Sequence, residues 1–106
     1  MKKHFVALVC LSLLSTSVPA VTVLGGGSCG QWISDRKSNK MMSATKEFWL
    51  LGYISGLAAA TDKDVLKGMD SNSMEAWIDN YCGNNPLDRF VNAADALFIE
   101  LVKRTK

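Results

Sequence analysis

Residues 72–86 read NSMEAWIDNYCGNNP and carry one helix together with its end. Five apolar residues in this stretch follow helical spacing: Met74, Trp77, Ile78, Tyr81 and Cys82. This spacing places them on one face of a helix, and a continuous apolar face predicts burial. Cys82 is therefore expected on the buried side of this helix.

The polar residues on either side of the apolar run predict where helices begin and end. Asn72 and Glu75 have the spacing of a capping box and predict the start of the helix. Gly83 predicts its end. Asn85 followed by Pro86 predicts the N-cap and the first position of the next helix. The chain is thus expected to pass directly from one helix into another.

The helix predicted after Pro86 has a long apolar stripe. Its members are Leu87, Phe90, Val91, Ala94, Leu97, Phe98, Leu101 and Val102. Basic residues follow at the C-terminal end, where they complement the negative end of the helix dipole. This helix is expected to pack along one side of the core.

A short helix is predicted upstream, where Cys29 and Trp32 share an apolar face and Ser28 suits the N-cap. A polar connector at 36–40 follows it. Ser43 is predicted to cap the next helix.

This second helix is predicted to run to about Ala60. Its apolar residues between 48 and 57 point in every direction around the axis, which predicts that it is the central helix. Residues 61–70 are expected to form a loop. Because no alternating strand pattern appears after residue 20, the predicted fold class is all-α, a small four-helix bundle.

Gly52 and Gly56 lie four residues apart in the central helix. This spacing permits a close helix crossing and occurs in membrane helices that associate. The apolar segment 48–60 is shorter than a membrane span needs. We therefore interpret the two glycines as a helix-packing motif inside the domain, with a backbone contact surface for a partner as the alternative.

The first twenty residues have the three parts of a secretory signal: Lys2 and Lys3, an apolar run, and small residues that end at Ala20. The run of about ten residues is too short for a membrane span, which takes about twenty. We therefore predict cleavage after Ala20, removal of Cys10, and a periplasmic protein without a membrane anchor. Residues 21–28 would form a flexible leader and residues 29–106 a single helical domain.

Two cysteines, Cys29 and Cys82, remain after cleavage, and the only histidine, His4, is lost. A small exported domain is expected to need a crosslink. We predict one disulfide between these two cysteines, with free thiols or half of a metal site as the alternative. A zinc site needs four ligands, so no metal and no cofactor are predicted.

The composition also excludes some classes of function. The chain after residue 20 has ten basic and ten acidic residues and is formally neutral, so nucleic acid is not an expected partner. Without histidine, nucleophilic pairs that need an imidazole base are excluded in this part of the chain. The protein is therefore predicted not to be an enzyme.

The remaining function class is protein binding through the surface. An exposed tryptophan next to Met41 and Met42 would create an apolar contact patch, and Trp49 is the candidate. Asp62 and Asp64, in the loop 61–70, are candidate contacts for a partner. The partner would be client proteins or one specific enzyme, and the chain could also form a homodimer.

Several segments resemble small exported helical proteins. These segments are CGQWI at 29–33, WLLGYISG at 49–56 and WIDNYCGNNP at 77–86, followed by Ala93, Ala94 and Leu97. They resemble the HdeA/HdeB family of acid-stress chaperones, which implies an HdeA-like fold with Cys29 and Cys82 as its disulfide. They also resemble the Rap1a/Tai family of periplasmic immunity proteins.

The two resemblances imply different functions. The first implies a non-enzymatic periplasmic binding protein that acts as a chaperone under envelope or acid stress. The second implies an immunity protein that inhibits an amidase effector of type VI secretion. The motif Gly52-Tyr53-x-x-Gly56 carries the second resemblance, together with Asn85-Pro86 and the paired alanines.

Overall fold

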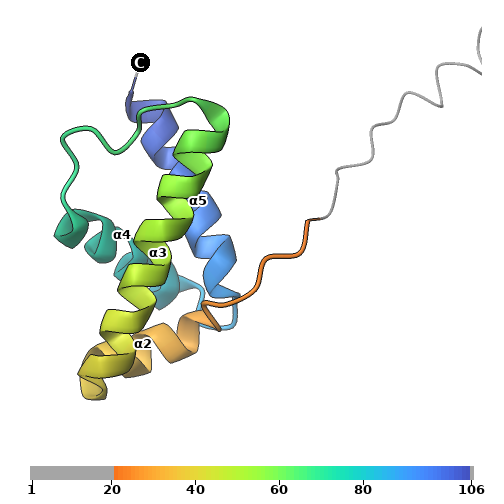
Figure 1. The fold of residues 1–106 in the computed structure, drawn as a ribbon. Coiled ribbons are helices and arrows are strands. Elements are labelled where there is room, and N and C mark those ends of the chain that lie inside the picture. The colour runs from red at the N-terminus through yellow and green to blue at the C-terminus, as the bar shows by residue number, and fades with distance from the viewer. Residues whose placement is uncertain (1–20, 106) are drawn as a thin grey trace, which may run out of the picture.

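The computed structural model describes residues 21–105 and contains four helices (Figure 1). They are α2 (Cys29–Ser38), α3 (Lys40–Thr61), α4 (Ser71–Asn84) and α5 (Phe90–Arg104). α2 and α5 each pack against both α3 and α4. The predicted all-α four-helix fold is confirmed. The predicted signal peptide, with Cys10, lies outside the described residues.

The N-terminus of α2 has the predicted cap. The Ser28 hydroxyl accepts a hydrogen bond from the Gln31 backbone N–H at 3.1 Å, and the Gln31 side chain accepts one from the Ser28 N–H at 3.0 Å. This reciprocal pair is a capping box, which satisfies two backbone donors that the first turn leaves unpaired. The cap fixes the direction in which the chain enters the bundle.

Substitution of this cap gives a first testable prediction. Ser28→Ala should lower the free energy of unfolding by about 1 kcal/mol, because the Gln31 N–H loses its acceptor. Ser34→Ala, on the exposed side of α2, should change it by less than about 0.5 kcal/mol. Urea denaturation of both variants checks the difference, and equal effects would contradict the role of the cap.

The start of α3 differs from the prediction. Asn39, not Ser43, is the N-cap, and its side-chain oxygen accepts a hydrogen bond from the Met42 N–H at 3.1 Å. Ser43 lies inside the helix and donates to Glu47 at 3.0 Å. The connector 36–40 is therefore mostly helical, since a single non-helical residue with a side-chain acceptor suffices to separate two helices.

The predicted start of α4 was wrong by two residues. Asp70 is the N-cap, and its carboxylate accepts hydrogen bonds from the Ser73 N–H at 2.7 Å and from the Ser73 hydroxyl at 2.9 Å. A carboxylate caps more strongly than an amide, because it also interacts with the positive end of the helix dipole. Glu75 is free of a capping role and turns toward α2 and α3 instead.

The predicted start of α5 was also wrong. Residues 86–88 form a turn, Arg89 pairs with Ser28 in an isolated β-bridge, and the helix begins at Phe90. The Asp88 carbonyl accepts a hydrogen bond from the Cys29 N–H at 2.9 Å, and the Gly27 carbonyl accepts one from the Phe90 N–H at 2.9 Å. These tertiary contacts to the start of α2 replace the helical geometry that Pro86 favoured.

α3 is buried on one side only and is not the all-round buried helix that we predicted. Its buried residues form one stripe: Ser43, Lys46, Leu50 and Ile54. Phe48, on another side of the helix, is 74% exposed. α3 therefore covers one side of the bundle, and its opposite side carries no other described part of the chain.

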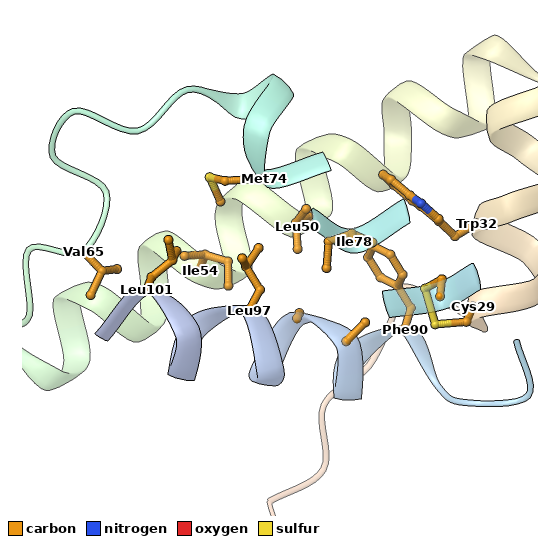
Figure 2. Close-up of a cluster of buried hydrophobic side chains, with 13 residues drawn as sticks. Cys29, Trp32, Leu50, Ile54, Val65, Met74, Ile78, Phe90, Leu97 and Leu101 are labelled. Carbon is orange, nitrogen blue, oxygen red and sulfur yellow. A yellow bond between two sulfur atoms is a disulfide. The ribbon is translucent and has the colours of Figure 1, made fainter. Parts of the chain in front are cut away.

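The core extends along the length of the bundle. Figure 2 shows its side chains from Cys29, Trp32 and Phe90 at one end to Val65 at the other. Val65 belongs to the 62–70 loop, and it is almost fully buried. The loop after α3 thus closes the far end of the core.

The predicted disulfide is confirmed. Cys29 and Cys82 are bonded and fully buried, and they join the start of α2 to the end of α4. Disulfides persist in oxidising compartments, so this bond fits a protein located outside the cytoplasm. No helix within residues 21–105 has the length and apolar character that crossing a bilayer requires.

Candidate functional site

A cluster of charged side chains joins three helices around Arg36 of α2. The guanidinium donates to both carboxylate oxygens of Asp79 of α4, at 2.9 and 2.7 Å. It also donates to Glu47 of α3 at 3.3 Å and to Glu75 of α4 at 3.5 Å. We call these four residues the Arg36 cluster. One cation thus faces three carboxylates.

Trp32 forms the inner side of the Arg36 cluster. Its indole N–H donates to Asp79 at 2.7 Å, and its ring lies under the Arg36 guanidinium at 5.2 Å. The ring also stacks on Phe90, with the two centroids 5.0 Å apart. The charged cluster is therefore coupled directly to the hydrophobic core.

Burial changes the acid–base properties of Glu75. Its pKa is raised above the ordinary value, chiefly because burial removes water from the carboxylate and next because of the nearby charge of Glu47. Arg36 acts in the opposite direction but does not cancel the shift. The carboxyl group of Glu75 therefore binds a proton more readily in the folded protein than in the unfolded chain.

Carboxylates also accept the other hydrogen bonds between side chains of different helices. Lys46 of α3 donates to Asp35 of α2 at 2.8 Å, and Tyr53 of α3 donates to Asp95 of α5 at 2.6 Å. Within residues 21–105, every side-chain hydrogen bond that joins two helices ends on an aspartate or a glutamate. Carboxyl oxygens are therefore the acceptors of the polar side-chain contacts between these helices.

Two further aspartates hold the ends of helices. The pKa of Asp88 is lowered, chiefly because the Tyr81 hydroxyl donates to it at 2.6 Å and because the Asn92 amide also donates. The pKa of Asp70 is lowered because the backbone N–H and the hydroxyl of Ser73 donate to it. Both groups favour the folded state when they are ionised.

The predicted contact residues do not form one patch. Met41 is 79% and Met42 41% exposed, near the start of α3. Asp62 and Asp64 are exposed beyond the other end of this helix, which is about 33 Å long at 1.5 Å per residue. The two groups are therefore separate surfaces.

Trp49 lies apart from both groups. Its ring stacks on Tyr53, with the centroids 5.0 Å apart and the planes at 9°. Its indole N–H donates to the carbonyl of Leu24 at 3.2 Å. Trp49 therefore contacts the segment that precedes α2, and it does not extend the surface of Met41 and Met42.

The two glycines of α3 do not mediate helix packing within the described chain. Gly52 and Gly56 are exposed, and an added Cβ would meet no atom within 4 Å at either position. The predicted close crossing therefore does not occur, because the other helices pack on the buried stripe of α3. The backbone of Gly52 and Gly56 faces solvent instead, as the alternative interpretation of a contact surface for a partner requires.

Phe48 is the surface residue that sequence reasoning missed. It shares a face with Met41, Gly52 and Gly56, and no charged residue occurs between Glu47 and Asp62. We call this uncharged side of α3 the neutral face. Exposed residues of α3 recur at spacings of four, three and four residues: Met41, Thr45, Phe48 and Gly52. This helical repeat is the signal in the sequence that distinguishes the neutral face from the buried stripe.

Comparison of the sequence and the fold with known proteins identifies no related protein. No protein-family model matches the sequence, no curated protein is significantly similar, and no solved structure matches the fold.

Proposed function

We propose that the protein is a non-enzymatic periplasmic binding protein that acts as an acid-stress chaperone. The observation that carries this proposal is that carboxyl groups accept every side-chain hydrogen bond between helices within residues 21–105. An uncharged carboxyl group accepts such bonds more weakly than a carboxylate, so loss of charge in acid would weaken the polar contacts of α2 and α3 with their neighbours. Acid would thereby loosen the bundle.

α3 is the helix that acid would release. The disulfide keeps α2 and α4 together at any pH, whereas α3 is held by side-chain contacts and by the buried stripe. With all ten carboxyl groups neutral, residues 21–106 carry only positive charge, which adds repulsion. Release of α3 would expose Leu50, Ile54 and the core that they cover, an apolar surface for unfolded clients.

The linkage of stability to pH gives a second testable prediction. Because the pKa values of Asp70 and Asp88 are lowered, their contribution is present above about pH 4 and is lost as the pH falls through the lowered values. The raised pKa of Glu75 has the opposite sign, since its protonation favours the folded state. We expect the two aspartates to dominate, so that stability falls below about pH 4.

A single substitution tests this assignment. Asp88→Asn should reduce the difference in unfolding free energy between pH 7 and pH 3, because one of the groups with a lowered pKa is removed. Asp64→Asn, at an exposed position in the 62–70 loop, should leave the difference unchanged. Urea denaturation at both pH values measures the effect. An unchanged pH dependence in the first variant would exclude Asp88 as a contributor.

The chaperone proposal is tested by light scattering from an aggregating client at pH 2–3 and at pH 7. We expect suppression only in acid. The double variant Glu47→Gln and Asp79→Asn removes the charge of two residues of the Arg36 cluster and should shift the onset of suppression to higher pH. The matched pair Asp62→Asn and Asp64→Asn should not. Absence of suppression at pH 2–3 would end the proposal.

A second candidate function is favoured by the exposed glycines. The motif Gly52-Tyr53-x-x-Gly56 resembles that of the Rap1a/Tai immunity proteins, and its two glycines present backbone to solvent on the neutral face. An inhibitor of one amidase needs such a preformed surface. A pull-down from periplasm separates the functions: one stoichiometric partner, lost in Gly56→Leu, supports inhibition, and many denatured clients support the chaperone.

A further inference from the structure

The residues before α2 lie on an aromatic surface. Trp49 stacks on Tyr53, and its ring centroid is 5.6 Å from that of Phe90. We call these three residues the aromatic platform. They come from the middle of α3 and the start of α5, so the platform spans two helices.

Residues 23–27, which we call the strap, contact this platform through their backbone. The Trp49 indole donates to the Leu24 carbonyl at 3.2 Å, and Arg89 donates to the Val23 carbonyl at 3.3 Å. The Gly27 carbonyl accepts a hydrogen bond from the Phe90 N–H at 2.9 Å. Figure 1 shows this extended segment, in orange, passing the start of α5 before it reaches α2.

Glycine is required at the contact itself. An added Cβ at Gly25 would collide with the indole nitrogen of Trp49, and one at Gly26 would lie 3.0 Å from the Phe90 ring. The φ angles of Gly25, Gly26 and Gly27 are +98°, +85° and +70°, a region that other residues rarely adopt. The close approach and the backbone conformation both exclude side chains.

The side chain of Leu24 contributes little to the contact, since it is 82% exposed. Val23, the other residue of the strap with a side chain, is partly buried. The contacts with the platform therefore come chiefly from carbonyl acceptors and from glycine backbone on aromatic rings. A segment from another polypeptide with the same features would make the same contacts.

We propose that the aromatic platform, with Arg89 beside it, is a binding site for extended glycine-containing segments of other polypeptides. The strap occupies this site in the free protein as an internal ligand. The site exists in the closed bundle, so it goes beyond acid-induced release of α3 and does not depend on it.

The affinity follows from the tethering of the strap. A short connection to Cys29 gives the strap an effective concentration of the order of millimolar. The site must have a lower dissociation constant than this to be occupied. A free peptide is therefore expected to bind a chain with a released strap with a Kd below about 1 mM.

The experiment uses the full chain after Ala20 at pH 7 and follows the indole N–H signal of Trp49 by NMR. Gly25→Ala should displace the strap and shift this signal, and Gly26→Ala provides a second release variant. A peptide with the sequence VTVLGGG of residues 21–27 should then restore the native position of the signal. The peptide VTVLAAA should not, because its methyl groups collide with the platform.

Gly68→Ala is the matched control variant. Gly68 has a φ of +77°, so alanine meets similar backbone strain there, but a Cβ at this position contacts nothing within 4 Å. The Trp49 signal should therefore keep its native position. The proposal is overturned if neither release variant moves the signal. It is also overturned if 1 mM VTVLGGG fails to restore the signal or if VTVLAAA restores it equally well. Client protection in acid is a separate measurement, so either proposal can fail alone.

Discussion

Replacing both Cys29 and Cys82 by alanine is expected to lower the free energy of unfolding by about 4 kcal/mol. The bond closes a loop with a sequence separation of 53 residues, which restricts the unfolded chain. Small domains have only about 5–15 kcal/mol in total, so a large share of the stability would be lost. Both sulfur atoms are buried in the core, which adds the cost of two small cavities.

Urea denaturation with and without reductant measures this effect. The native chain should be destabilised by reductant, whereas the double alanine variant should not respond to it. If the free energy of unfolding of the variant lies within about 1 kcal/mol of that of the native chain, the disulfide is not the main source of stability. The bundle would then be held chiefly by its apolar core.

The second large effect is expected at Phe90. Phe90→Ala should cost about 3–5 kcal/mol, because this ring is fully buried between Trp32 and Trp49 and its removal leaves a cavity. The substitution would also remove the aromatic ring against which Gly26 packs. Thermal or urea unfolding, followed by helical circular dichroism, measures the loss.

Phe48→Ala is the matched control, since it removes the same side chain from another helix. Phe48 is 74% exposed, and its loss should change the unfolding free energy by less than about 0.5 kcal/mol. The same variant should weaken binding of any partner that uses the neutral face. Equal destabilisation by the two substitutions would contradict the placement of Phe48 at the surface.

Local spacing was sufficient to predict the four helices and the buried positions of both cysteines. Cys29 with Trp32, and Ile78 with Cys82, recur at three or four residues, and all four side chains are buried. Such spacing is a property of neighbouring turns and needs no tertiary information. With two cysteines after residue 20, the pairing had few alternatives.

Helix ends were less predictable because several polar residues compete for each cap. Asn39 and Asp70 cap α3 and α4, although Ser43 and Asn72 have suitable side chains nearby. The start of α5 depends on hydrogen bonds from Cys29 and Phe90 that join distant parts of the chain. A local pattern contains no information about such contacts.

The Arg36 cluster could not be predicted at all. Its members come from three helices, and the spacing of residues within one helix gives no information about contacts between helices. Glu75 was interpreted as a capping residue, yet its side chain is only 11% exposed and approaches Arg36. Only the packing of α2 against both α3 and α4 brings these charges together.

The disulfide makes residues 29–82 a covalent ring that contains α2, α3 and α4 up to Cys82, while α5 lies outside it. A protease that cuts the exposed loop between α3 and α4 therefore opens the ring without separating its parts. The nicked molecule keeps the mass of one chain in non-reducing electrophoresis and divides into two fragments after reduction. One fragment then carries α2 and α3, and the other carries α4 and α5.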